Sequence, residues 1–192
     1  MKEYKIIDPG PEGYYLDNYQ GYDDDWELVE GYSLSSEWPD DVSINAHAES
    51  GQVVGSDSES DFLRSVATGP IVSAKVKDLL EAESAEVEFL PVKVSDHNEK
   101  ELGGNYYALN ILTKIDAIDL DETPHTIDSL DDSQIELDGP LTLDTSKIPS
   151  SAHLFRLEKY NTILLASTEL VQKMQDNGVS NLKITNLENY SG

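Results

Sequence analysis

A strand–helix–strand pattern occurs twice in this chain, and it restricts the possible folds more than any other feature. In the first copy, the apolar pair Ile71–Val72 precedes Ser73, a residue type that caps helices. Residues at helical spacing follow, and residues 87–92 then return as a strand that alternates at first. The residues of the predicted helical face are Val76, Leu79, Leu80 and Glu83.

The second copy lies further along the chain and has the same order of parts. Residues 163–166 form the first strand, Ser167 caps the helix, Gly178 ends it, and residues 182–184 form the second strand. The predicted helical face consists of Leu170, Val171 and Met174.

The spacing between the two copies is nearly constant. Three pairs, Ser73 and Ser167, Val76 and Leu170, and Leu80 and Met174, are each 94 positions apart, and Phe89 and Ile184 are 95 apart. We predict a diverged internal duplication with two helices packed on a shared sheet. Chance similarity between two ordinary units is the alternative. The expected fold class is α/β or α+β, with a mixed sheet, two pseudo-repeated units and an irregular acidic N-terminal lobe.

The length of 192 residues suits a single domain, or two half-sized lobes that share one core. We expect one domain over residues 1–192. Its parts are an aromatic and acidic lobe over about 1–60, the first unit over about 70–94, strands with an acidic segment over about 104–146, and the second unit over about 153–187.

Several smaller elements are predicted from local patterns. Within the lobe, residues 26–32 are expected to form a short strand, residues 35–44 a turn and a strand, and residues 46–58 a mobile loop. Between the two units, residues 106–112 and 117–120 are expected to form strands, with a hairpin turn at Gly103–Gly104.

The charge of the chain is strongly negative. Thirty-eight Asp and Glu residues stand against thirteen Lys and Arg, which gives a formal net charge of -25. Each contact to a nucleic acid phosphate needs a cation, so nucleic acid and anionic membranes are unlikely partners and a basic partner is favoured. The alternative is a solvated acidic surface in a halotolerant organism.

The acids are unevenly distributed. Residues 1–60 carry fifteen acids against Lys2 and Lys5, and residues 116–146 carry ten acids without a single Lys or Arg. An uncompensated block of this kind is uncommon in a purely structural segment, which favours a role in binding.

No catalytic, cofactor-binding or metal-binding residues are predicted. The chain has no Cys, its four His residues lack metal-ligand spacing, and neighbouring acids such as Asp23–Asp24 or Asp40–Asp41 are typical of hydrated turns. Phosphate-binding and nucleophile motifs do not occur, and only Arg64 and Arg156 offer a guanidinium group. The first residues lack an apolar stretch typical of signal peptides, so a cytoplasmic protein is expected.

Binding is the chemistry that the aromatic and acidic residues support. Trp side chains are enriched in binding hot spots, and surrounding carboxylates steer a basic partner. Burial of both Trp residues in a core is the alternative. The predicted binding residues are Asp23, Asp24, Asp25, Trp26, Trp38, Asp40, Asp41, Asp128, Asp131 and Asp132.

Several short strings, in order and spacing, resemble a known family over nearly the whole chain. They are residues 26–34 with Trp38–Pro39, residues 71–80, residues 87–92, residues 107–120 and residues 154–157. They resemble the eleventh family of immunity proteins of bacterial polymorphic toxin systems, formerly described as a domain of unknown function. The resemblance implies stoichiometric binding of a cognate toxin, which the charge suggests is a cationic nuclease. It provides no binding-site residues.

Two other functions are compatible with the sequence. A non-catalytic regulatory or scaffold domain would need the acidity only for solubility. A carboxylate-dependent hydrolase would need a deep pocket in which several carboxylates have raised pKa values. The oligomeric state does not follow from the sequence.

Overall fold

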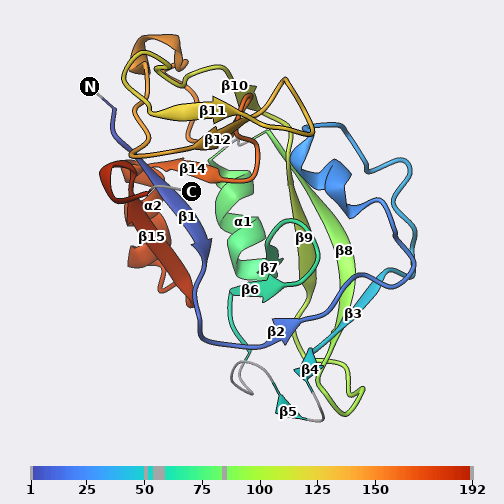
Figure 1. Cartoon of the computed structure of the whole chain (residues 1–192). Helices are drawn as coiled ribbons and strands as arrows, with labels where there is room; N and C mark the ends of the chain where they lie inside the picture. Colours follow the sequence, from blue (N-terminus) through green and yellow to red (C-terminus); the bar gives the residue numbers. More distant parts are fainter. Residues whose placement is uncertain (1, 50–51, 54–58, 84–85, 191–192) are drawn as a thin grey trace.

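The computed structural model of the chain describes residues 2–49, 52–53, 59–83 and 86–190. Within them the fold is α+β, as predicted, but the strands form two main sheets instead of one shared sheet (Figure 1). The five-stranded sheet has the order β10 (Lys114–Ile115), β13 (Leu154–Leu157), β14 (Leu164–Ser167), β1 (Tyr4–Pro9) and β15 (Leu182–Asn186).

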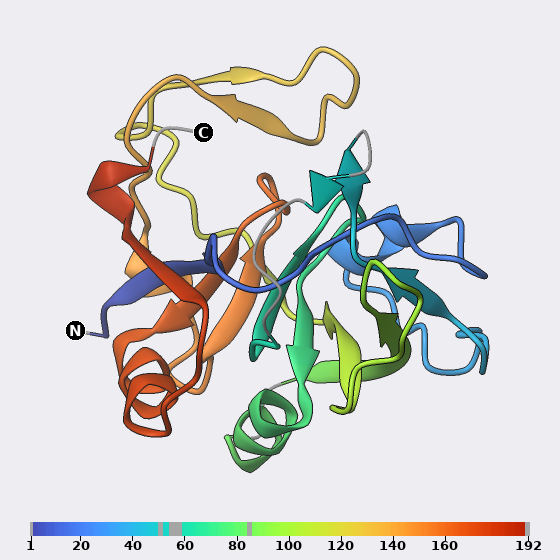
Figure 2. The same ribbon diagram turned by 90° about the horizontal axis from the view of Figure 1, so that it is seen from below.

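The six-stranded sheet has the order β2 (Tyr15–Leu16), β6 (Phe62–Ser65), β7 (Ile71–Ser73), β9 (Tyr106–Ile111), β8 (Val87–Ser95) and β3 (Ser43–Asn45). Two small hairpins, β4 (Ala48–Glu49) with β5 (Gln52–Val53) and β11 (His125–Ile127) with β12 (Ile135–Leu137), complete the strands. Helices α1 (Ala74–Ala82) and α2 (Thr168–Asp176) lie on one side of the molecule, and hairpin β11–β12 lies on the opposite side (Figure 2).

The two sheets have the same strand order over five strands. The order β2–β6–β7–β9–β8 corresponds to β10–β13–β14–β1–β15. The first pair of each series is parallel and the other pairs are antiparallel. Strand β1 lies between β14 and β15, as β9 lies between β7 and β8, although β1 comes from the opposite end of the sequence. The duplication stays a prediction, which superposition of residues 70–92 on 164–187 would test.

The predicted N-caps of both helices are confirmed, and Gly178, the predicted C-cap, lies one residue beyond the C-cap of α2. The Ser73 hydroxyl accepts a hydrogen bond from the Val76 N–H at the start of α1, and the Ser167 hydroxyl accepts one from Leu170 at the start of α2. Helix α2 has Asn177 as its C-cap, and Gly178 follows with φ +63°, a left-handed conformation that favours glycine. These caps satisfy backbone groups that a helix end leaves unpaired.

Each sheet is covered on both faces by apolar side chains. The helices and the facing strand residues form one core that both sheets share, in which Val76, Leu80, Leu170 and Met174 are buried. Strand β1 shows the alternation that this arrangement requires, because Ile7 belongs to the shared core and Ile6 to a separate core on the other face. The two sheets are thereby fixed relative to each other.

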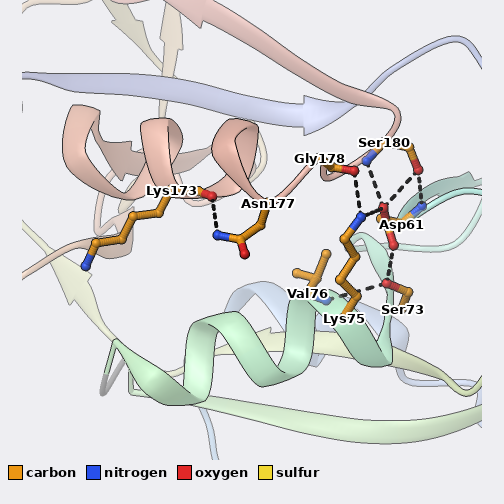
Figure 3. Close-up of polar contacts among 8 residues, drawn as sticks. All are labelled: Asp61, Ser73, Lys75, Val76, Lys173, Asn177, Gly178 and Ser180. Carbon is orange, nitrogen blue, oxygen red and sulfur yellow. Dashed lines mark hydrogen bonds and ion pairs between the residues drawn. The ribbon is translucent and has the colours of Figure 1, made fainter.

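Asp61 joins the two units through polar contacts (Figure 3). Its carboxylate accepts hydrogen bonds from the Ser73 hydroxyl at 2.7 Å, the Lys75 ammonium at 3.1 Å, and the Ser180 backbone and hydroxyl at 2.8 and 3.0 Å. Lys75 also donates to the Gly178 carbonyl at 2.6 Å. One carboxylate therefore connects the start of α1 to the loop after α2.

Three local predictions need correction or qualification. Residues 26–32 do not form a strand. Residues Asp25–Val29 form a 3₁₀ helix, η1, whose buried residue is Leu28. Acidic residues disfavour strands, and Gly31, at φ +75°, follows as the helix ends. Residues 117–120 form an isolated bridge, between Ile118 and Leu143, instead of the predicted strand. The Ala117 N–H donates to the nearby Ile115 carbonyl and is therefore not available to pair with a neighbouring strand.

The loop predicted at residues 46–58 contains hairpin β4–β5, and residues 50–51 and 54–58 lie outside the described part of the chain. The predicted strand near residue 44 is confirmed as β3, and Gly103–Gly104 lies in the β8–β9 hairpin connection. Among the described residues, none of the helices has the length and apolar character needed to cross a bilayer.

Candidate functional site

A cavity of about 550 Å³ lies where the two sheets and helix η1 meet. Its walls come from β1, β2, η1, β6, the loop over residues 67–70, β13 and the start of β14. We call it the central cavity. Its volume is in the range of small-ligand sites, and most of its wall is fixed by strands whose other faces are buried in the cores.

Arg64 and Arg156, the two arginines of the chain, both line the central cavity. They occupy the third position of β6 and of β13, which are corresponding strands in the matched sheet orders. A chain with a net charge of -25 therefore places both of its guanidinium groups at one internal site.

Arg156 is a buried arginine whose guanidinium is only partly hydrogen-bonded. Its side chain is 1% exposed, and its Nη1 donates a hydrogen bond of 2.8 Å to the Asn161 carbonyl. Its Nε is buried without a hydrogen-bond partner. Burial lowers the pKa of Arg156 to about 10, and the negative charge of Asp8 acts in the opposite direction. Asp8 also lines the cavity.

Asp8 and Arg64 complete the charged part of the wall. Burial raises the pKa of Asp8, while Lys183 and Arg156 act to lower it. Lys183 faces Asp8 across strands β1 and β15. The Arg64 guanidinium lies 5.0 Å from the centre of the Tyr15 ring, a cation–π contact that orients it.

A second hollow, of about 610 Å³, borders the central cavity and shares Thr162 with it. We call it the hairpin hollow, because hairpin β11–β12 forms one wall. Glu30, Asp128 and Asp131 bring carboxylates to it. Hydrogen bonds from Ser133 lower the pKa of Asp131, which keeps this exposed carboxylate ionised.

Carboxylates hold helix η1 between the two hollows. Asp25 accepts a hydrogen bond from the Thr68 N–H in the cavity wall. Glu30 accepts hydrogen bonds from Asn161 at 2.8 Å and from Lys114 at 3.2 Å. Trp26, between these two clamps, lines the central cavity and is 52% exposed. Its position is therefore fixed although much of its ring is open to solvent.

The two Trp residues have different surroundings. Trp38 packs against Tyr22 and Tyr19, and its indole N–H donates to the Pro91 carbonyl at 2.9 Å. Trp38 is therefore a structural residue at the edge of the core, whereas Trp26 is available to a partner.

The structure brings only some of the predicted binding residues together. Trp26, Asp25, Asp128 and Asp131 lie on the walls or clamps of the two joined hollows. Asp40 lines a separate hollow beside β8, and Asp41 follows it in an exposed turn. The exposed members of the predicted set are Asp23, Asp24, Trp26, Asp40, Asp41, Asp131 and Asp132.

Large exposed hydrophobic side chains lie on segments that border the two hollows. In the part of the chain that the structure describes, these are Trp26, Tyr32, Val66, Ile127 and Leu130. Ile127 and Leu130 flank Asp128 at the tip of hairpin β11–β12, where Leu130 is 96% exposed. Exposed apolar groups surrounded by carboxylates are typical of a surface that binds another protein.

A hydrolase site finds little support in this arrangement. Catalysis by paired carboxylates needs two acids across one cleft. Asp8 is the single acid among the described residues that line the central cavity. The acids that line the hairpin hollow are Glu30, Asp128, Asp131 and Glu136. Hydrogen bonds from Ser133 lower the pKa of Asp131, whereas the hydrolase hypothesis requires raised pKa values. Nor do His, Asp and Glu side chains gather in threes as a metal site anywhere in the described part of the chain.

Sequence reasoning missed Tyr15, Asp8 and Thr162, and it noted the two arginines without placing them together. One pattern could have found the arginines. The strings Phe62–Ser65 and Leu154–Leu157 each carry Arg at the third position, and each precedes the first strand of one predicted repeat, residues 71–72 or residues 163–166. Extending the duplication one strand upstream aligns them.

The two sheets share one core, and two joined hollows lie beside exposed aromatic and acidic side chains. The chain belongs to the immunity protein family Imm11, whose family model matches residues 2–189. The resemblance seen in the sequence is confirmed, and the partner of a protein of this family is a toxin. A search of curated proteins finds no match to this chain.

Proposed function

We propose that the chain neutralises a cationic toxin by forming a stoichiometric complex through the face around Trp26 and hairpin β11–β12. The observation that carries the proposal is that exposed hydrophobic side chains and the carboxylates of hairpin β11–β12 border the same two hollows. Exposed aromatic anchors supply binding energy, and the carboxylates raise the association rate with a basic partner. The protein would act in the cytoplasm.

A nuclease is the proposed class of toxin. Nuclease surfaces that bind nucleic acid are basic, and an acidic inhibitor can cover such a surface in place of phosphates. Residues 116–146 provide ten acids without a cation, and hairpin β11–β12 presents part of this block at the surface.

The first experiment is co-expression of the chain with the protein encoded immediately upstream of its gene. The expected result is rescue of growth together with co-purification in a fixed ratio. Toxicity without rescue or complex formation would contradict the proposed partner. In vitro degradation of DNA and RNA by the toxin, with and without the chain, tests the nuclease assignment.

The binding face is tested by a pair of charge-matched variants. Asp131→Asn with Asp132→Asn removes two charges from the hairpin, and Asp176→Asn with Glu188→Gln removes two exposed charges elsewhere. We expect the first variant alone to slow association at low salt, because steering depends on where the charges lie. Equal slowing by both variants would support only a general charge effect and contradict the proposed face.

A further inference from the structure

The central cavity has the properties of a small-molecule site that a toxin-binding surface does not require. It is bounded by strands of both sheets, and its volume of about 550 Å³ exceeds what one inserted side chain would fill. We propose that it binds a small organic carboxylate, with the anionic group between Arg156 and Arg64 and the apolar body against Trp26 and Tyr15.

The guanidinium of Arg156 carries the proposal. A buried cation is costly unless hydrogen bonds and opposite charges compensate it. Arg156 is 1% exposed, and its guanidinium has a single described hydrogen bond, to the Asn161 carbonyl. Its Nε lacks an acceptor while the residue lines an open cavity. A carboxylate in the cavity would bring Arg156 the opposite charge that it lacks, and a small shift of the buried side chain would let its Nε–H donate to a carboxylate oxygen.

Arg64 provides the second donor group from the other sheet. The residue is partly exposed, and its contact with Tyr15 holds the guanidinium at the wall. Planar guanidinium groups bind carboxylates through paired N–H donors, which makes two of them at one cavity a suitable anion site. The formal net charge of the chain is -25, so a cavity wall with two guanidinium groups and one acid is opposite in sign to the chain as a whole.

Asp8 decides the class of anion. Two arginines and one aspartate give the wall a formal charge of about +1, with Asp8 counted as ionised. A monoanionic carboxylate balances that charge, whereas a phosphate monoester, with up to two negative charges, would be repelled by Asp8. Trp26 and Tyr15 offer flat apolar surfaces, so a carboxylate on an aromatic or aliphatic body fits best.

Nuclear magnetic resonance of the full chain tests the proposal directly. The chain has two arginines, so its spectrum contains two side-chain Nε–H signals, which Arg64→Gln and Arg156→Gln assign by removing one each. Phenylacetate is the probe, with phenyl phosphate and neutral phenylacetamide as comparisons. We expect saturable movement of the Arg156 Nε–H signal and of the Trp26 indole signal with phenylacetate.

Affinity measurements on variants complete the test. Loss of either guanidinium should weaken phenylacetate binding about tenfold or more, the effect of losing one charge-assisted hydrogen bond. Lys147→Gln, which removes an exposed positive charge elsewhere, should leave it unchanged. Arg64→Gln remains informative if Arg156→Gln fails to fold, because Arg64 lies partly in solvent.

Three results would overturn the proposal: no saturable shift with phenylacetate, equal binding of phenylacetamide, or unchanged affinity in the Arg64 variant. If phenyl phosphate bound more tightly than phenylacetate, the site would be one for phosphate esters, and the role given to Asp8 would be wrong. These measurements use the chain alone, so they do not depend on whether the toxin proposal holds.

Discussion

Replacement of Asp61 by Asn should destabilise the protein, because the carboxylate connects the two units. Asp61 is largely buried and accepts four hydrogen bonds, from Ser73, Lys75 and twice from Ser180. An Asn side chain has the same shape but no charge. Its NH₂ group would also face the N–H and O–H groups that donate to the carboxylate in the original protein. Hydrogen bonds to charged groups contribute about 1.5–3 kcal/mol against about 1 for neutral ones, so we expect a net loss of about 2–3 kcal/mol.

The pH dependence gives the prediction a second, independent part. Burial alone would raise the pKa of Asp61, but hydrogen bonds from Ser180, Ser73 and Lys75 outweigh it and hold the pKa below its ordinary value. Because the pKa of Asp61 is lower in the folded state, the ionised carboxylate contributes its full stabilisation above the unfolded-state pKa of about 4. This contribution is lost as the pH falls through the pKa of the folded state. The difference between the original protein and Asp61→Asn should therefore shrink below about pH 4.

Urea unfolding and thermal melts at pH 7 and pH 3 provide the assay. A loss of about 2–3 kcal/mol corresponds to a melting temperature lower by about 5–10 °C in a chain of this size. Asp132→Asn, an exposed carboxylate with the same chemical change, is the control. The reasoning would be refuted if both variants unfolded alike, or if the deficit of Asp61→Asn persisted undiminished at pH 3.

The remaining predictions concern the tryptophans and one glycine. Trp26→Ala should change the free energy of unfolding by less than about 0.5 kcal/mol yet weaken toxin binding about 30-fold, as measured by calorimetry. Trp38→Ala, which removes packing against Tyr22 and a hydrogen bond to Pro91, should instead lower stability by about 2–3 kcal/mol. Gly178→Ala should lower it by about 1–2 kcal/mol because φ is +63°. Gly103→Ala should not, because its Cβ would meet only the Glu59 side chain, at an ordinary contact distance of 4.0 Å.

The helices were predictable because their determinants are local. Ser73 and Ser167 cap, and apolar residues three and four positions apart place one face in a core, so neighbouring residues suffice. Helix η1 was not predictable as such. Its conformation depends on contacts of Asp25 and Glu30 with distant loops, and a strand pattern in residues 26–32 gave no indication of them.

The sequence predicted that the chain has a binding surface, but it did not predict which residues form that surface or where the cavity lies. Composition indicated a binding surface, but it could not separate Trp26 from Trp38, because exposure depends on which ring finds a pocket among other aromatic residues. The central cavity depends on how two sheets meet. Arg64 and Arg156 lie on strands of different sheets, so they meet at one cavity only through the packing of the two sheets, which no short stretch of sequence determines.

Strand β1 has a consequence for how the protein is made. Its residues 4–9 pair on both sides with β14 and β15, which are synthesised much later, so the five-stranded sheet cannot close around its inner strand until residues 164–186 have been made. Pairing between such distant segments is slow, and it leaves an unpaired strand on a growing chain. The six-stranded sheet, whose strands all precede residue 112, can form earlier and serve as the template on which the other half assembles.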